Sequence, residues 1–379
     1  MVCDSPADSP LRILHISSAQ AFGGGERHLV DLVKGLATRG HDVQVAVRPQ
    51  SPLIGELGNL PRQNVIELPL RNALDARSAD QLARLVKSRQ LEIVHAHMAR
   101  DYPLAAYATR RNSGAQLIVT RHVLFPLNRL HRVTLSRVGR VIAVSEAVKR
   151  RLVAETLVAL EKITVVHNGI DVAGFAAATN QFDRKQFCRD WSLPEESRLV
   201  GSVGALTPLK GHEDFVQAMS RIAADVPTAH FVVAGIDSSS SQENRLSIER
   251  LIQKLGLQTR FTLMGRMDDV KPLFCALEVF VSASHSESFG LAIAEAMAAG
   301  AAVVATETEG AQEIVRHGQT GLLVPIGDVR AMAQSVSAVL GNPERKEQLT
   351  NSARDDVRAR FSLDRMVEET EKIYQECLA

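Results

Sequence analysis

Two carboxylates eight positions apart, Glu287 and Glu295, are the residues of this chain best placed to do chemistry. The segment around them predicts an otherwise apolar helix, with Glu287 at its start and Glu295 inside it. A carboxylate binds sugar hydroxyls well because it offers two acceptor oxygens. Alternatively, Glu287 only stabilises the helix electrostatically and Glu295 is an ordinary, partly buried carboxylate. Burying a charge in an apolar helix without a partner is costly, which favours a binding role for Glu295.

The same segment also suits a phosphate group. Eight helical residues span about 12 Å, a separation that fits the sugar and ribose ends of a nucleotide sugar. Ser288 follows the first carboxylate. The N–H groups of Phe289, Gly290 and Leu291 are expected to form the free start of the helix. Such groups bind anions, so we expect a diphosphate there.

A loop with a lysine, residues 204–212, follows the predicted strand Leu199–Val203. Lys210 lies in this loop just before the next helix, at the end of a strand where α/β sheets bind ligands. Its ammonium group would act as a point charge for a diphosphate oxygen. An exposed loop lysine without a ligand remains an equal alternative, because exposure is the commonest fate of lysine.

A glycine-rich turn, Phe22 to Glu26, follows the first predicted strand and precedes the predicted helix Arg27–Ala37. Gly24 and Gly25 would let the backbone approach a ligand closely, and the helix start favours an anion. The spacing is not G-x-G-x-x-G, which argues against a dinucleotide site. A flexible turn in which Glu26 stabilises the first helical turn is the competing interpretation.

Histidines follow two further strands. His122 comes after the strand Gln116–Thr120 and could reach a ligand, although a hydrogen-bonded structural histidine is an equal alternative. His95 and His97 share one face of a strand, but no third ligand is near them in sequence. Packing or loop histidines are therefore favoured over a metal site. The four cysteines lie far apart and predict reduced thiols.

These residues must be positioned by parallel strands, and the sequence predicts eleven strands. They alternate with helices of about 10–15 residues, and several are apolar on both faces, as buried parallel strands are. The fold class is therefore α/β, with two Rossmann-like doubly wound domains facing across a cleft. The predicted strands are Arg12–Ile16, Asp42–Val47, Glu92–His95, Gln116–Thr120, Arg140–Val144, Ile163–Val166, Leu199–Val203, His230–Ala234, Arg260–Met264, Val279–Ser282 and Ala302–Ala305.

The strand pattern is interrupted once, by a polar stretch from Asp171 to Arg198, and this interruption marks a domain boundary. We expect domains at 1–172 and 173–360. The final segment, 361–379, reads as an amphipathic helix with Ser362 as its N-cap. Its apolar stripe contains Met366, Ile373 and Cys377.

The composition excludes several classes of protein. The 379 residues are 45% hydrophobic and carry a net charge of +1, which is typical of a globular chain and not of a disordered one. No apolar run reaches the roughly 20 residues of a membrane-spanning helix. The N-terminus has no basic or apolar region of a secretory leader. We therefore expect a cytoplasmic protein.

The charges are distributed unevenly. Residues 1–170 carry 23 basic and 14 acidic side chains out of totals of 44 and 43. The excess is densest in the segment 121–151, which is either a solvated surface or a patch that faces anionic lipid on the inner face of the plasma membrane. Only Phe125 is aromatic there, which argues against nucleic acid. The basic residues of the segment are Arg121, Arg129, Arg132, Arg137, Arg140, Lys149, Arg150 and Arg151.

Together, these motifs resemble those of the GT-B-fold retaining glycosyltransferases of family 4. The resemblance covers residues 11–378, and its most specific part is the pair of glutamates with the residues around them. The matching motifs, in order, are FGGGE from Phe22, TRHV from Thr120, VSE from Val144, HNGID from His167, PLKG from Pro208, ESFGLAIAEAMAAG from Glu287 and GQTGLLV from Gly318.

The resemblance implies transfer of a hexose from a nucleotide-sugar donor to an acceptor hydroxyl, with retention of configuration. It implies that Glu287 contacts the donor sugar and that Glu295 contacts the ribose. Lys210 would neutralise the diphosphate together with the N–H groups of residues 289–291. No metal and no other cofactor is expected, since the family usually needs none and no Asp-x-Asp element is present.

For the N-terminal, acceptor-side domain, the resemblance implies that Gly24 and Gly25 border the donor phosphate and the acceptor. It places His122 near the reacting sugar and implies that the C-terminal helix crosses back to this domain. A UDP-sugar is the favoured donor and GDP-mannose the second. The expected acceptor is a glycan or lipid-linked hydroxyl in the synthesis of cell-envelope polysaccharide, lipopolysaccharide or glycolipid.

The sequence departs from the family pattern at Ala205, where members usually carry an arginine that clamps the phosphate. Lys210 and the helix start could suffice, or Arg266 could substitute. The alternative function is a GT-B-shaped binding partner without catalytic activity.

Overall fold

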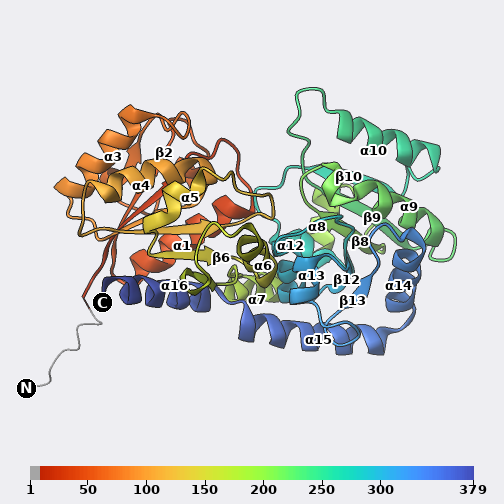
Figure 1. Cartoon of the computed structure of the whole chain (residues 1–379). Helices are drawn as coiled ribbons and strands as arrows, with labels where there is room; N and C mark the ends of the chain where they lie inside the picture. The colour runs from red at the N-terminus through yellow and green to blue at the C-terminus, as the bar shows by residue number, and fades with distance from the viewer. Residues whose placement is uncertain (1–8) are drawn as a thin grey trace, which may run out of the picture. The chain divides into compact units, whose positions relative to one another are not determined.

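The computed structural model describes residues 9–379, which form two compact units. Unit 1 contains the chain up to Gly169 together with Leu363–Ala379, and unit 2 is Ile170–Ser362. The chain therefore passes between the units twice, and its last helix belongs to the same unit as its first strand (Figure 1).

Unit 1 is built on a parallel sheet of seven strands in the order β3-β2-β1-β4-β5-β6-β7. β1 pairs with β2 on one side and with β4 on the other, so the strand order reverses at this point. Such a reversal leaves room for a ligand beyond the carboxyl ends of the strands. The strands are β1 (Arg12–Ser17), β2 (Asp42–Val47), β3 (Val65–Glu67), β4 (Ile93–Ala96), β5 (Gln116–Arg121), β6 (Arg140–Ala143) and β7 (Ile163–Val165).

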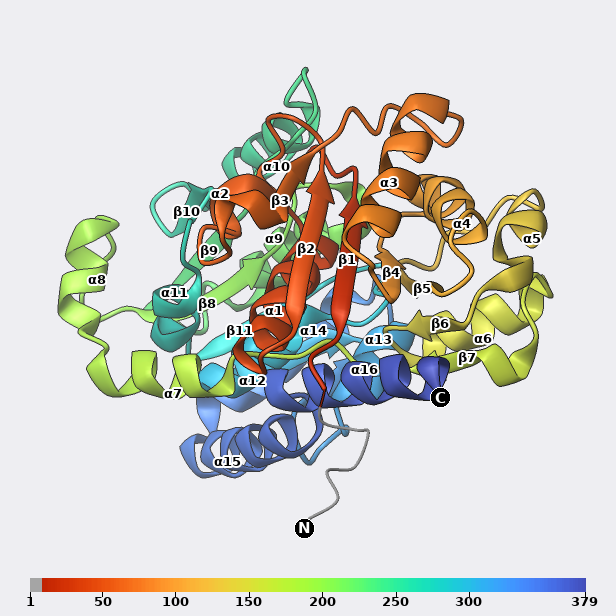
Figure 2. The same ribbon diagram turned by 90° about the vertical axis from the view of Figure 1, so that its left-hand side faces the viewer.

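Helices α1 and α16 pack together over one part of this sheet (Figure 2). Their apolar residues, among them Leu29, Val33 and Tyr374, share one core with residues of β1 and β2. The helices touch closely at Gly35, where a Cβ would lie 2.4 Å from Val367 Cγ2. The helices of unit 1 are α1 (Gly24–Thr38), α2 (Leu53–Glu56), α3 (Ala76–Ser88), α4 (Tyr102–Arg110), α5 (His131–Thr134), α6 (Glu146–Glu155) and α16 (Leu363–Leu378).

Unit 2 repeats the architecture with a parallel sheet of six strands in the order β10-β9-β8-β11-β12-β13. The order again reverses beside β8, which pairs with β9 and β11. Its main core lies among the sheet, α9 and α14 (Figure 1). The strands are β8 (Arg198–Val203), β9 (Ala229–Ala234), β10 (Phe261–Gly265), β11 (Val279–Ser282), β12 (Ala302–Thr306) and β13 (Leu322–Val324).

The helices of unit 2 include two, α7 and α8, in the stretch where the sequence predicted no strand. The helices are α7 (Val172–Gln181), α8 (Arg184–Asp190), α9 (His212–Ile222), α10 (Glu243–Lys254), α11 (Lys271–Ala276), α12 (Leu291–Ala299), α13 (Glu309–Ile314), α14 (Val329–Gly341) and α15 (Pro343–Arg360). No helix among residues 9–379 is long and apolar enough to span a bilayer.

The prediction of two Rossmann-like doubly wound sheets is confirmed, and all eleven predicted strands are present with small shifts at their ends. β3 and β13 were not predicted. Both are three-residue strands at the edge of a sheet, too short to show a period, whereas β7, of the same length, lies in the longer apolar run Ile163–Val166.

Candidate functional site

Lys210 and Glu287 meet in unit 2 at the carboxyl ends of two paired strands, β8 and β11. Nζ of Lys210 donates to Oε1 of Glu287, and Ser284 Oγ donates to the same oxygen at 2.9 Å. The lysine side chain is 31% exposed and the glutamate side chain 14%, so both can reach a ligand. An ammonium group suited to phosphate and a carboxylate suited to sugar hydroxyls therefore lie side by side.

Glycines allow the loops to approach closely enough for this contact. Gly211, next to Lys210, has a left-handed φ of 62°, and a Cβ there would lie 1.9 Å from the carbonyl oxygen of Ala283. A Cβ on Gly235, after β9, would lie 1.8 Å from the carbonyl oxygen of Gly204. Any side chain at either position would force a loop to move.

The helix that follows Glu287 begins later than the sequence predicted. Gly290, with a left-handed φ of 109°, is the N-cap of α12, so the prediction that Glu287 starts this helix is wrong. Glu287, Ser288 and Phe289 form the turn before it. The first N–H that bonds back is that of Ile293, to Gly290 O at 3.0 Å. The N–H of Leu291 precedes it and is available at the start of α12.

The turn from Glu287 to Phe289 is held from both sides. The Phe289 side chain is buried and meets the Phe361 ring edge-on at 5.4 Å, so this side chain packs inside the unit and does not face a ligand. The N–H of Gly310 donates to Glu287 O at 3.2 Å. Ser288, inside this turn, is partly exposed, and Glu295 lies partly buried inside α12.

In unit 1, Gly24 and Gly25 form the first turn of α1, which starts three residues earlier than predicted. The N–H of Gly23 donates to Glu26 Oε2 at 3.0 Å, so Glu26 stabilises the helix start. A Cβ on Gly25 would lie 3.4 Å from Cγ of His122. Two of the predicted residues, Gly25 and His122, are therefore neighbours.

His122 belongs to a group of five histidines, which we call the histidine cluster. Its members come from four elements or the residues directly after them: His15 of β1, His28 of α1, His95 and His97 of the β4 end, and His122 of the β5 end. His15 Nδ1 lies 3.0 Å from His97 Nε2, and His97 Nδ1 lies 3.5 Å from His122 Nε2. These elements are far apart in the sequence. This explains why no third histidine could be seen near His95 and His97 from the sequence alone.

His95 is held more firmly than the other members. Its Nδ1 lies 2.6 Å from the hydroxyl of Tyr374 in α16, and its Nε2 lies 2.7 Å from Thr120 Oγ1. The side chains of both His95 and Tyr374 are fully buried. The predicted structural role of His95 is therefore a packing and hydrogen-bonding role at the centre of the sheet.

Burial keeps the cluster neutral. It lowers the pKa of His15 to about 3 and that of His28 to about 4. Burial, reinforced by the neighbouring histidines, also lowers the pKa values of His95, His97 and His122 well below the ordinary value. His15 and His28 were not predicted as site residues. The one feature of the sequence that could have indicated them is that each is a polar residue within an otherwise apolar strand or helix face.

An acidic residue is buried near the same strand ends. Asp101 accepts a hydrogen bond from the N–H of Ser18 at 2.8 Å. Burial raises the pKa of Asp101 to about 6, against the opposing effects of Ser18 and Arg100. Arg100 itself donates to Ser18 Oγ at 2.7 Å, so this group fixes the loop after β1.

The basic segment 121–151 differs from the predicted patch in one respect. Arg121 is buried, and its guanidinium donates to the carbonyl oxygen of Phe125, so it holds the loop together and is not part of a surface patch. Exposed apolar side chains accompany the remaining arginines: Phe125 is 65% exposed, Leu130 75% and Val133 66%. The arginines exposed among them are Arg129, Arg132 and Arg137.

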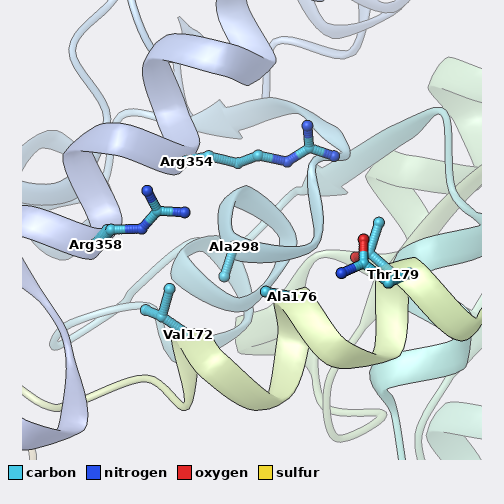
Figure 3. Close-up of a pocket in the computed structure, with 7 residues that line it drawn as sticks. Val172, Ala176, Thr179, Ala298, Arg354 and Arg358 are labelled. Carbon is cyan, nitrogen blue, oxygen red and sulfur yellow. The ribbon is translucent and has the colours of Figure 1, made fainter.

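A pocket in unit 2 is lined by none of the predicted site residues. It lies between α7, α12 and α15, with two arginines on its α15 side (Figure 3). Arg354 donates to the carbonyl oxygen of Ala299 at 3.2 Å, which holds its side chain against the end of α12. The lining residues are Val172, Ala176, Thr179, Asn180, Ala298, Arg354 and Arg358.

Two Rossmann-like units, each with a parallel sheet, are the architecture of the GT-B class of glycosyltransferases, whose solved structures this fold matches. Residues 22–173 match the family described as Glycosyltransferase Family 4, and residues 183–356 match Glycosyl transferases group 1. The chain belongs to the glycosyltransferases of group 1 and family 4.

Proteins similar to this chain include enzymes of different pathways. The N-acetyl-alpha-D-glucosaminyl L-malate synthase of Bacillus anthracis is 26% identical, with 96% of each chain covered. The lipopolysaccharide core biosynthesis glycosyltransferase LpsE of Rhizobium meliloti is also 26% identical, over 90% of this chain and 92% of LpsE. The structure of Anabaena HepE in complex with UDP and glucose has a TM-score of 0.80 at 21% identity, covering 96% of this chain and 98% of HepE.

Proposed function

We propose that this chain is a retaining hexosyltransferase that uses a nucleotide-sugar donor, with UDP-sugars favoured over GDP-mannose. The observation that carries the proposal is the Lys210–Glu287 pair beside the start of α12. The complex of HepE with UDP and glucose supports the choice of a UDP-linked donor. The relative LpsE supports an acceptor in cell-envelope glycan or glycolipid synthesis.

In the proposed reaction, the bond between the anomeric carbon and the diphosphate oxygen breaks, and a bond from the acceptor oxygen forms on the same face. The acceptor proton passes to the departing phosphate oxygen. Lys210 neutralises the charge that develops on the diphosphate, with the N–H groups at the start of α12, and Glu287 holds the sugar hydroxyls. Glu295 binds the ribose, and His122 with the turn at Gly24 and Gly25 borders the reacting groups. Donor binding is expected without added metal.

The contact between Lys210 and Glu287 bears on how a donor would bind. Lys210 donates to Glu287, so this carboxylate partly balances the charge of the lysine. A diphosphate competes with Glu287 for this ammonium group. Sugar hydroxyls can then occupy the released carboxylate oxygen, which couples phosphate binding to sugar binding.

Ala205 favours a second candidate function. It is exposed and follows Gly204, the first residue after β8, at the position where family members usually carry the phosphate clamp. Arg266 follows β10, two strands away from β8, and its Nε lies 3.4 Å from Asp268 Oδ1. A chain without the clamp could bind nucleotide sugar weakly or not at all and act as a partner without catalytic activity.

Calorimetric titration with UDP, GDP and ADP in metal-free buffer tests the proposal. We expect saturable binding of UDP, weakened at least about tenfold, or 1.4 kcal/mol, in Glu295→Ala. The matched control is Glu249→Ala, which removes an exposed glutamate that pairs with Arg245 in the same unit. If the folded wild type binds none of the three nucleotides, the non-catalytic candidate replaces the proposal.

We also propose that the segment 123–137 touches an anionic membrane when the acceptor is lipid-linked. Exposed Phe125, Leu130 and Val133 can enter the interface while the arginines between and after them meet lipid phosphates. Sedimentation with vesicles of phosphatidylglycerol and phosphatidylcholine tests this. Leu130→Ser should release the protein even at low salt, and Leu74→Ser, at another exposed leucine in unit 1, should not. Equal sedimentation of both variants would refute the membrane surface.

A further inference from the structure

Three members of the histidine cluster, His28, His97 and His122, have the arrangement of a metal ligand set. One ring nitrogen from each lies within 4.8 Å of the others. Their ring centroids are 4.8 Å (His28–His122), 5.7 Å (His97–His122) and 6.0 Å (His28–His97) apart. Two imidazoles on one tetrahedral zinc ion, with Zn–N distances of 2.0–2.1 Å, have centroids about 5 Å apart. Small side-chain rotations would therefore bring the three nitrogens onto one ion.

The unused nitrogens of His28 point to a missing partner. Its side chain is buried, and neither ring nitrogen has a hydrogen-bond partner among residues 9–379. Asn168 raises the pKa of His28 as a neighbouring hydrogen-bonding group does, but its Oδ1 meets the geometry of a hydrogen bond with neither ring nitrogen. A buried ring nitrogen without a partner is costly, so it calls for an explanation, and a bound ion is one that fits here.

The other nitrogens of the set are also suitably placed. Nε2 of His97 is hydrogen-bonded to His15, so Nδ1 of His97 is the atom directed at His122. A partner on the second nitrogen fixes the ring and its tautomer, as it does for most metal-bound histidines. His122 is only partly buried, so an ion can reach the site from solvent on this side.

A second set of three, His15, His95 and His97, is equally compact but less suitable. Both nitrogens of His95 are engaged by Thr120 and Tyr374, and His15 and His97 bond each other. A metal there would have to break one of the two short hydrogen bonds of His95. The first set would lose only the long contact, 3.5 Å, between His97 Nδ1 and His122 Nε2.

We propose that His28, His97 and His122 form a site for a divalent ion of the zinc class, with a fourth position open to water. Three neutral imidazoles suit Zn²⁺, Co²⁺, Ni²⁺ and Cu²⁺, and do not suit Mg²⁺ or Ca²⁺, which take oxygen ligands. If the proposed function holds, an ion on His122 competes with the reacting sugar, and zinc inhibits transfer.

Cobalt titration of untagged, chelator-treated protein tests the site without any donor or acceptor. We expect one Co²⁺ per chain with the intense visible absorption of tetrahedral cobalt, displaced by one equivalent of Zn²⁺ and not by excess Mg²⁺. His28→Gln and His122→Gln should each abolish this absorption. His122 is the less buried of the two, so its variant keeps the test valid if His28→Gln does not fold.

The matched control is His41→Gln, which removes a partly buried histidine of the same unit that bonds Glu371 at 2.9 Å. It should bind cobalt as the wild type does. Lack of stoichiometric cobalt binding by the wild type, or wild-type absorption in both ligand variants, would overturn the site. Neither outcome depends on nucleotide binding, so failure of the metal site and failure of the proposed function are separately visible.

Discussion

Mild acid should destabilise unit 1 far more than unit 2, because the histidine cluster must stay neutral in the folded state. The pKa of His15 is lowered from 6.5 to about 3 and that of His28 from 6.5 to about 4. The unfolded chain therefore binds more protons than the folded one, and stability falls as the pH drops below 6.5. The stabilisation is fully present above pH 7 and is lost progressively toward pH 4.

The size of the effect follows from these values. At pH 5 an unfolded histidine is almost fully protonated, so each of His15 and His28 costs about 2 kcal/mol relative to pH 8. Asp101 acts in the opposite direction. Because its pKa is raised in the folded state, its protonation stabilises unit 1 by about 1 kcal/mol between pH 8 and pH 5. His95, His97 and His122 add to the loss. The free energy of unfolding of unit 1 should therefore fall by at least about 3 kcal/mol. This is a large part of the 5–15 kcal/mol that is typical of a folded protein.

The distribution of aromatic residues lets the two units be followed separately. All three tyrosines, Tyr102, Tyr107 and Tyr374, belong to unit 1, and the single tryptophan, Trp191, belongs to unit 2. In urea with a chelator present, the tyrosine circular-dichroism midpoint should fall by about 1–2 M between pH 8 and pH 5. The Trp191 fluorescence midpoint should fall less, since unit 2 has two buried histidines against five in the cluster. They are His212, whose pKa burial lowers to about 4, and His230, whose pKa burial also lowers.

The variant His28→Gln is the internal check, because it should reduce the pH dependence of the tyrosine transition by about 2 kcal/mol. If the tyrosine midpoint moves no further than the tryptophan midpoint, or if His28→Gln leaves the difference unchanged, the cluster is not the cause of acid lability.

Three further predictions concern packing and catalysis. Gly35→Val should destabilise unit 1 by about 1–3 kcal/mol through a clash with Val367, lowering the tyrosine midpoint in urea and sparing the tryptophan midpoint. Lys210→Ala should lower turnover about 100-fold or more with a smaller effect on donor affinity, whereas Lys271→Ala, a control in the same unit, should leave steady-state kinetics unchanged. Glu287→Gln should abolish transfer yet tighten UDP binding in calorimetry, because it frees Lys210; weaker UDP binding would contradict the ion-pair argument.

The fold could be predicted from the sequence because buried parallel strands are recognisable locally. β9 is buried along its whole length, and its apolar run is visible in the sequence. β3 and β13 were not found this way, since three residues show no period and these two strands are recognised by the neighbours they pair with. The burial of Arg121 could not be predicted either. Its charge suggested a surface position, but its guanidinium is buried because it donates to the carbonyl oxygen of Phe125.

The candidate site was predictable where its residues are close in sequence and only partly where they are not. The motif at Glu287 was visible, but the left-handed Gly290 delays the helix and leaves Glu287 in the preceding turn. The histidine cluster depends on the strand order, which places β1 beside β4 and β4 beside β5. Nothing in the linear sequence places His28 next to His122, so only the fold could show this group.

The position of α16 in unit 1 has a consequence for synthesis. Once Gly169 has been made, 210 more residues must follow before residue 379 is in place, which takes about 10–40 s at 5–20 residues per second. During this interval, the surface of α1 around Gly35 lacks its covering helix, and His95 lacks the Tyr374 hydroxyl. Unit 2 is continuous and can fold meanwhile. The unit that leaves the ribosome first is thus completed after unit 2, and a chain that stops before α16 leaves the unit that contains its own first strand incomplete.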